Sequence, residues 1–302
     1  MTDTPANTSA HPAGLLVSTA WLADHLADHL ADGDLVILDA SKHLPAAARD
    51  PRAEFEAGHI PGARFLDLAS LTDAASPVPQ ALPNAAQLGE RLGALGVSEG
   101  ARIVLYDDSD VKTSARAWFT LSAHGVGNVA ILDGGLAKWR SEGRALEAGP
   151  ASMDAAPPPA LAAATGLRFK ADMLANLDRD PESGAEQVLD ARAADRVFGA
   201  GTDPVHGGEN GRIPGALNLP FGGVYNADGT FKSPDDLRAA FIAAGVDLDR
   251  PVTTTCGSGV TASVLLFALR LIGKQDVALY DGSWSEWSAD PDTPKAQGAE
   301  PA

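Results

Sequence analysis

The chain has 302 residues, 40 acidic and 23 basic, which give a formal net charge of −17 at neutral pH. This charge argues against nucleic acids and anionic membranes as partners, and no apolar run approaches the roughly 20 residues of a membrane span. The single cysteine excludes an intramolecular disulfide framework and favours a reducing compartment. At roughly 100 to 200 residues per domain we expect two domains in a soluble, cytoplasmic protein.

The N-terminal residues 1–14 contain no basic residue before the first apolar stretch and no apolar core, so they do not resemble a secretory signal. We predict a disordered tail there. Apolar runs then alternate with amphipathic stretches, which predicts strands at 35–38, 103–106 and 129–132 and helices at 86–95 and 114–123. These elements define a first domain at 15–145.

Residues 146–166 contain Pro157, Pro158 and Pro159 among alanines and glycines, which is typical of an extended linker. The same alternation then returns over a second domain at 167–302. Strands are predicted at 188–189, 252–255 and 277–280, and helices at 235–244 and 260–272. Alternating strands and helices predict an α/β fold in which each domain is a mainly parallel sheet flanked by helices.

Three segments of the first domain are repeated about 150 residues later, in the same order. The segment Gly-His-Ile-Pro-Gly-Ala at 58–63 matches Gly-Arg-Ile-Pro-Gly-Ala at 211–216, and Asp-Gly-Gly at 133–135 matches Asp-Gly-Ser at 281–283. The predicted strand before Asp107 matches the one before Cys256. The chain is therefore a duplicated domain in which only the second copy carries the thiol.

Cys256 lies between a predicted strand and a predicted helix, where ligands bind in parallel sheets. The loop consists of Cys256, Gly257, Ser258, Gly259, Val260, Thr261 and Ala262. Its glycines allow successive N–H groups to turn inward, and the helix N-terminus favours a thiolate over a thiol. A buried cysteine is often inert packing, but packing does not require a Gly-Ser-Gly turn. We therefore predict that Cys256 is a nucleophile in a cradle of backbone amides.

Together, the tandem Ile-Pro-Gly-Ala segments, the Asp-Gly turns and this cysteine loop resemble the two-domain rhodanese-type sulfurtransferases. Within that family the loop is most similar to those of enzymes that use 3-mercaptopyruvate. The resemblance implies a catalytic second domain, a non-catalytic first domain and a Cys256 persulfide that passes sulfur to a thiol, a thioredoxin-like protein or cyanide. It implies no metal and no organic cofactor.

The resemblance also implies that Arg196 binds the substrate carboxylate, with Arg192 as the alternative, although Arg192 could pair with a neighbouring acid instead. A second arginine expected after Pro204 is absent, because Val205 and His206 follow it. His206 and Arg212 are the candidates to replace it. Thiosulfate therefore remains open as the main donor.

Other residues have two interpretations each. Ser258 contacts the donor or is a plain turn residue. The resemblance implies that His59 lies near the domain interface, and the alternative is that it caps local backbone. Asp50 and Asp107 support the site or form turns. The three tryptophans are most simply aromatics of the core or of the cleft wall: Trp139, Trp284 and Trp287.

Two rival functions are weaker. A phosphatase of the Cys-x5-Arg type needs an arginine where this chain has Ala262. A non-enzymatic binding module of the same family would not need Cys256 in an intact loop.

Overall fold

The computed structural model describes residues 14–32, 35–151, 153–206 and 208–298. The predicted disordered tail at 1–14 lies outside these residues except for Gly14. The first domain contains, in order, β1 (Leu16–Val17), α1 (Thr19–Asp32), β2 (Leu35–Asp39), α2 (Pro51–Ala57), β3 (Arg64–Phe65), α3 (Ala85–Ala94), β4 (Arg102–Tyr106), α4 (Ser114–Ala123), β5 (Val129–Leu132) and α5 (Gly135–Ser141).

The second domain repeats the same succession of elements. It contains β6 (Leu167–Arg168), α6 (Lys170–Leu177), β7 (Gln187–Asp190), α7 (Ala194–Phe198), β8 (Leu217–Asn218), α8 (Pro234–Ala243), β9 (Val252–Thr255), α9 (Val260–Leu271), β10 (Val277–Tyr280) and α10 (Ser283–Ala289). Short 3₁₀ helices accompany them at Pro45–Ala47, Pro181–Ser183 and Phe221–Val224. None of the helices in the described part of the chain is long and apolar enough to cross a bilayer.

Each domain is built on a five-stranded sheet whose paired strands are all parallel. The strand orders are β1-β5-β4-β2-β3 and β6-β10-β9-β7-β8, which are equivalent under the repeat. The inner strands are buried along their whole length, as expected for parallel strands covered on both faces. The predicted α/β fold and the duplication are confirmed.

The predicted strands and helices all occur, with ends shifted by at most one residue. The sequence prediction missed the edge strands β1, β3, β6 and β8, because two residues carry no periodic signal. It also missed α1 and α6, which have 14 and 8 residues. The other missed helices, α2, α5, α7 and α10, have only five to seven residues each. These elements depend on the tertiary fold more than on local sequence.

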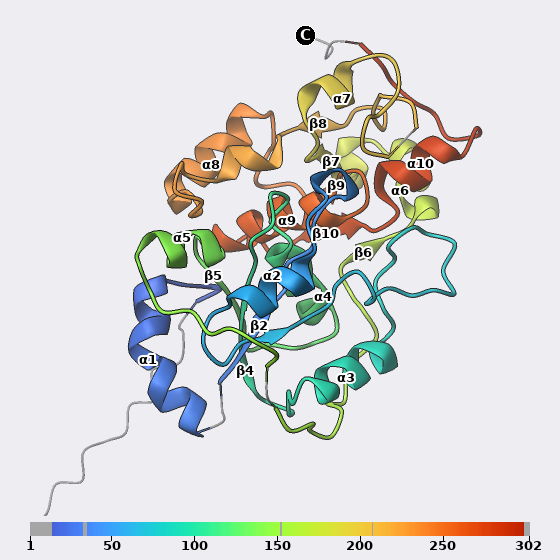
Figure 1. The fold of residues 1–302 in the computed structure, drawn as a ribbon. Coiled ribbons are helices and arrows are strands. Elements are labelled where there is room, and N and C mark those ends of the chain that lie inside the picture. Colours follow the sequence, from blue (N-terminus) through green and yellow to red (C-terminus); the bar gives the residue numbers. More distant parts are fainter. Residues whose placement is uncertain (1–13, 33–34, 152, 207, 299–302) are drawn as a thin grey trace, which may run out of the picture.

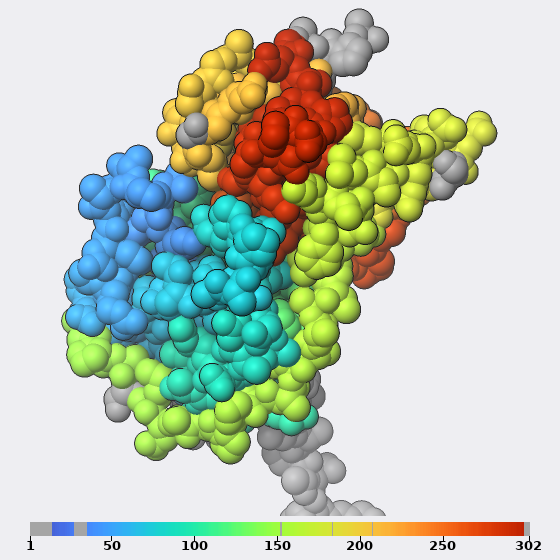
Figure 2. All heavy atoms as spheres, turned by 90° about the vertical axis from the view of Figure 1, so that its right-hand side faces the viewer, coloured from blue at the N-terminus to red at the C-terminus, as the bar shows by residue number. Residues whose placement is uncertain are grey.

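The chain between α5 and β6 packs along the first domain before it enters the second. The N–H of Ala156 donates to the carbonyl of Gly93 over 2.9 Å, and that of Thr165 donates to Ala123 over 2.9 Å. A side chain at Gly93 would lie 3.0 Å from Pro158, so glycine permits the close approach. Figure 2 shows this segment, in light and yellow green, crossing the first domain and rising to the second. The linker borders at 146 and 166 remain predictions.

Helices α4 and α9 pack against each other at the centre of the molecule and join the two domains (Figure 1). Trp118 on α4 meets Phe267 on α9 edge to face, with 4.9 Å between ring centroids. Two hydrogen bonds at equivalent positions of the repeat also connect the domains. Leu82 N–H of the first domain donates to Asp281 over 2.9 Å, and Phe231 N–H of the second donates to Asp133 over 2.8 Å. The main apolar core is therefore shared by both domains.

Candidate active site

Cys256 is the first residue after β9, and its residue surface is 2% exposed. Its N–H donates to the hydroxyl of Ser283 over 3.3 Å, and its carbonyl accepts from Trp284 N–H at 2.9 Å. The turn after β10 therefore fixes the backbone of the cysteine. Gly259, at φ +79°, ends the loop and begins α9, a conformation that glycine adopts without strain. The thiol thus lies directly at the N-terminus of a long buried helix.

Asp107 provides an internal comparison, because it occupies the equivalent strand end in the first domain. Its two carboxylate oxygens accept N–H groups from Ser109 over 2.9 Å and from Ser114, the first residue of α4, over 2.8 Å. At this strand end, backbone N–H groups thus stabilise the negative charge of a carboxylate. In the second domain Cys256 occupies the equivalent position, and the loop between it and α9 is shorter than the loop between Asp107 and α4.

The remaining groups of the loop are also held by hydrogen bonds. The carbonyl of Gly257 accepts from the N–H and the hydroxyl of Ser285, at 2.9 and 2.6 Å. The hydroxyl of Ser263 donates to the carbonyl of Gly259 over 2.8 Å. Ser258 is 7% exposed, and no hydrogen bond to its hydroxyl occurs within the described residues. Its hydroxyl therefore has no competing protein partner there.

Arg192 is almost fully buried below this loop. Its guanidinium donates to Asp190 over 2.7 Å and to the carbonyl of Gly211 over 2.6 Å, and it stacks on Trp284 at 4.7 Å. The ion pair predicted as the structural alternative is therefore present. One nitrogen, Nη1, has no hydrogen-bond partner in the described chain and lies 3.6 Å from Asp203.

Arg196, on α7, is held by the buried carboxylate of Asp203. Its Nη2 lies 2.7 Å from one oxygen of Asp203, and the N–H of Val205 donates to the other oxygen over 2.8 Å. Burial raises the pKa of Asp203, but the hydrogen bonds from Arg196 and Val205 outweigh it and bring that pKa below its usual value. Asp203 is therefore ionised, and Arg196 is fixed in one orientation.

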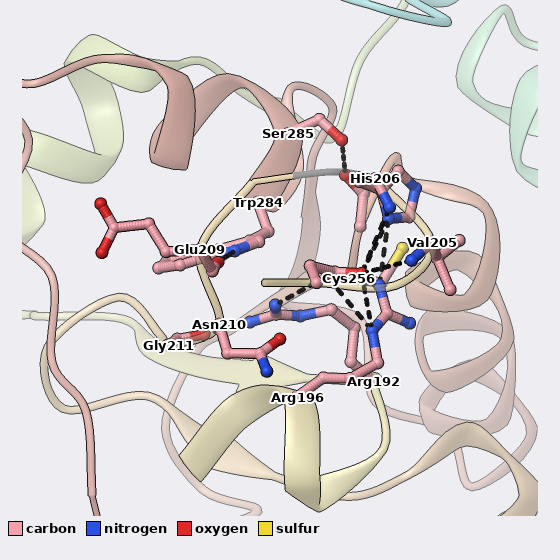
Figure 3. Close-up of polar contacts among 12 residues, drawn as sticks. Arg192, Arg196, Val205, His206, Glu209, Asn210, Gly211, Cys256, Trp284 and Ser285 are labelled. Carbon is pink, nitrogen blue, oxygen red and sulfur yellow. Dashed lines mark hydrogen bonds and ion pairs between the residues drawn. The ribbon is translucent and has the colours of Figure 1, made fainter. Parts of the chain in front are cut away.

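His206 joins this cluster to the cysteine loop. Its Nδ1 lies 3.0 Å from Nη2 of Arg196 and accepts from it, which places the ring hydrogen on Nε2. A Cβ at Gly257 would lie 2.0 Å from the imidazole, so the ring covers that glycine. Burial, followed by the charge of Arg196, lowers the pKa of His206. A neutral imidazole thus lies over the loop, with Arg192 and Arg196 beside Cys256 (Figure 3).

His59 and Arg212 occupy equivalent repeat positions and make local contacts. His59 stacks on Phe55 at 3.9 Å and its Nδ1 contacts the Phe55 carbonyl at 2.8 Å. Arg212 lies over Phe198 and donates to the carbonyl of Gly298 over 2.9 Å. Each also forms an antiparallel bridge, to Glu147 and to Ala296 respectively. These contacts match the local-capping interpretation of His59 and do not bring Arg212 to the cysteine loop.

Asp50 caps the N-terminus of α2 by accepting from two backbone N–H groups, as its turn-forming alternative predicts. The three tryptophans are buried, as expected: Trp139, Trp284 and Trp287. Sequence reasoning missed Asp203, whose Asp-Pro context indicated only a turn. It also missed Ser283 and Ser285, because the contacts of their hydroxyls with the loop are tertiary. Within the described residues, no cluster of three or more His, Cys, Asp or Glu side chains could hold a metal ion.

The rhodanese-like domain family matches the chain twice, at residues 22–142 and 172–290. The 3-mercaptopyruvate sulfurtransferase of Mus musculus is 40% identical over 274 residues, covering 90% of this chain and 91% of the relative. The thiosulfate sulfurtransferase of Rattus norvegicus is 38% identical, covering 94% and 95%. The crystal structure of SseA from Escherichia coli, described as a 3-mercaptopyruvate sulfotransferase, matches with 35% identity and a TM-score of 0.76, covering 91% and 100%. The chain belongs to the rhodanese family and carries two rhodanese-like domains in tandem.

Proposed function

We propose that this protein is a sulfurtransferase that moves sulfur from 3-mercaptopyruvate through a persulfide on Cys256 to an acceptor. The observation that carries the proposal is the position of Cys256. It lies at the strand end where the first domain holds a carboxylate with amides, and His206 covers its loop. The sulfurtransferase names of the relatives support the same chemistry and disfavour a non-enzymatic binding module.

In the first half-reaction the Cys256 thiolate attacks the thiol sulfur of 3-mercaptopyruvate. An S–S bond forms and the C–S bond of the donor breaks, with its electron pair leaving on carbon as the enolate of pyruvate. The enolate is protonated at that carbon, and the outer sulfur of the persulfide loses its hydrogen. The amides of residues 257–262 stabilise the negative outer sulfur.

The donor carboxylate binds at the cationic cluster. Arg196 supplies a guanidinium that Asp203 orients, and Arg192 adds a nitrogen without a hydrogen-bond partner in the described chain. His206 takes the place of the absent second arginine as a neutral donor through Nε2, suited to the keto oxygen of the donor. The hydroxyl of Ser258 can donate to the same group.

In the second half-reaction an acceptor removes the outer sulfur and restores the Cys256 thiolate. Cyanide leaves as thiocyanate, whereas a thiol, including that of a thioredoxin-like protein, leaves as a persulfide. A reducing, cytoplasmic compartment fits this chemistry because the nucleophile must stay a free thiol. The chain needs neither a nucleic acid nor a membrane for either step.

Thiosulfate is the alternative donor, favoured by one observation: Val205 stands where a second carboxylate-binding arginine was expected. Cys256 would then attack the outer sulfur of thiosulfate and release sulfite. A dianion gains more from cationic side chains, and the loop itself supplies only glycines and Ser258.

The test is a steady-state comparison of both donors with one fixed acceptor. We expect kcat/KM for 3-mercaptopyruvate to be at least tenfold higher, equivalent to about 1.4 kcal/mol in the transition state. Cys256→Ser should be inactive with both donors. A higher kcat/KM with thiosulfate would establish the alternative, and turnover by Cys256→Ser would contradict the persulfide route.

A further inference from the structure

One buried cation of the first domain, Arg116, lies against the Cys256 loop of the second domain. Arg116, on α4, is 7% exposed, and its Nη2 donates to Asp281 of the second domain over 2.8 Å and to the carbonyl of Gln80 over 2.9 Å. Asp281 is 4% exposed and directly follows β10. An ion pair this deeply buried holds its two elements in a fixed relative position.

The guanidinium of Arg116 also lies against the loop itself. A Cβ at Gly259 would lie 2.8 Å from Nη1 of Arg116 and 3.4 Å from the carbonyl oxygen of Asp281. The loop, the turn after β10 and Arg116 are therefore in mutual contact. That turn is also the one that binds the backbone of Cys256 through Ser283 and Trp284.

Nη1 of Arg116 is buried and has no hydrogen-bond partner in the described chain, so Asp281 pairs with the guanidinium through Nη2 alone, and the Nη1 edge lies against the loop without an acceptor. A cavity of about 20 Å³ beside Val260 is lined by Arg116 and Lys42 and has room for one water molecule. Burial, and then the charge of Arg116, lowers the pKa of Lys42. Both observations place a cationic environment at the start of α9.

We propose that Arg116 is a positioning residue for the Cys256 site, supplied by the domain that lacks the thiol. It braces the turn that fixes Cys256, and it adds a positive charge behind the loop that favours anionic sulfur in both the thiolate and the persulfide. This inference rests on the proposed function only in taking Cys256 as the reacting group. It makes the first domain part of the active centre.

The first domain also brings Lys42 to the cavity beside Val260. The second domain contributes His206, which covers Gly257, with Arg196 and Asp203 behind it and Arg192 below. They remain unchanged in the variants below. Arg116 and Asp281 have opposite charges and share one hydrogen bond, so their variants separate a charge effect from a loosened loop.

The experiment measures the rate of iodoacetamide alkylation of Cys256 as a function of pH in the full chain, where Cys256 is the only thiol. We expect Arg116→Met to move the midpoint of the profile up by about half a unit to one unit, and so to slow alkylation about three- to tenfold below it. Asp281→Asn should move the midpoint down, because Arg116 then keeps its charge without a counter-ion. Arg116→Lys should stay near the wild-type midpoint.

A matched control is Lys138→Met, which breaks another ion pair between the domains, Lys138–Asp228 at 3.3 Å, on the exposed surface; its profile should not move. Equal or same-sign shifts in Arg116→Met and Asp281→Asn would overturn the proposal. If Arg116→Met does not fold, an unchanged profile in Asp281→Asn overturns it alone. Alkylation needs no sulfur donor, so the result stands whichever donor the protein uses.

Discussion

Two buried aspartates at equivalent repeat positions, Asp39 and Asp190, end strands β2 and β7. Asp190 is paired with Arg192 two residues later, whereas Asp39 has Ser41 at that place and accepts its N–H over 2.8 Å, with a further hydrogen bond from Tyr106. Burial raises the pKa of Asp39 to about 6, against the lowering effect of Ser41. Arg192, which lies below the Cys256 loop, thus pairs with Asp190 of the second domain. The equivalent Asp39 of the first domain has no ion pair with a cation among the described residues.

Asp39→Asn should stabilise the protein at neutral pH. In the unfolded chain this carboxyl ionises near 3.9, so between about pH 4 and pH 6 the folded state binds a proton that the unfolded state releases. Stability therefore falls as the pH rises through that window and remains lower above it. We expect a gain of about 3 kcal/mol at pH 7 and little gain at pH 4. Urea unfolding at both pH values measures this.

The matched control for that change is Asp190→Asn, which leaves the buried charge of Arg192 without its main partner. It should destabilise the protein by about 3 kcal/mol. An Asp39→Asn protein that is no more stable than wild type at pH 7 would contradict the assigned ionisation.

Among the elements, the short connection from β9 to α9 positions Cys256, because only three residues lie between the cysteine and the start of α9. Gly257 lets His206 lie on the loop, and Gly259 adopts the positive φ that starts α9. The segment 203–206 after α7 then reaches the loop through Arg196 and His206. Two loops of the second domain therefore contact each other at Cys256, and the donor-binding role proposed for Arg196 and His206 depends on this contact.

Gly257→Ala should lower kcat/KM without unfolding the protein. Its Cβ would collide with the His206 ring, while its φ lies outside the left-handed region that disfavours alanine. We expect a loss of about tenfold, in KM more than in kcat, with Tm changed only slightly. A steady-state assay beside a thermal melt measures both.

A double-mutant cycle with His206→Ala sharpens that test. In the His206→Ala background, Gly257→Ala should add little further loss, because the ring it displaces is gone. Fully additive losses would show that the alanine acts on the loop rather than on His206.

The sequence predicted the inner strands and helices α3, α4, α8 and α9 well because their apolar runs are continuous or clearly periodic, as in residues 103–106 and 114–123. It did not predict α1, although that helix has 14 residues. It also located Cys256 and its loop, because glycines beside a lone cysteine are a local signal. It did not predict that Asp203 orients Arg196 or that Arg116 contacts Gly259. Arg116 and Gly259 are far apart in the chain, so no sequence spacing indicates their contact. Asp203 is only seven residues from Arg196, but the loop that brings the two together has no periodic pattern.

In the whole molecule, the two domains are joined by a shared core and by two hydrogen bonds at equivalent positions of the repeat. Trp118 and Phe267 meet where α4 and α9 cross the interface. Because the apolar cluster extends through both domains, neither domain can lose its packing without exposing the other. We therefore expect one cooperative unfolding transition.

Trp118→Ala should lower the stability of both domains together, by about 3 to 5 kcal/mol, since it removes a buried aromatic from the shared core. Calorimetry should show a single transition at lower temperature. Ile242→Ala, at a side chain on α8 that is 61% exposed, should leave Tm nearly unchanged. Two separated transitions, with only one displaced by Trp118→Ala, would contradict a shared core.

A single-turnover experiment without acceptor shows whether Cys256 carries the sulfur. The protein is mixed with 3-mercaptopyruvate, released pyruvate is quantified, and the mass of the peptide that contains Cys256 is measured by mass spectrometry. We expect about one pyruvate per chain and the mass of one added sulfur atom on Cys256, with neither in Cys256→Ser. Pyruvate release from Cys256→Ser, or sulfur bound elsewhere in the chain, would contradict this role of Cys256.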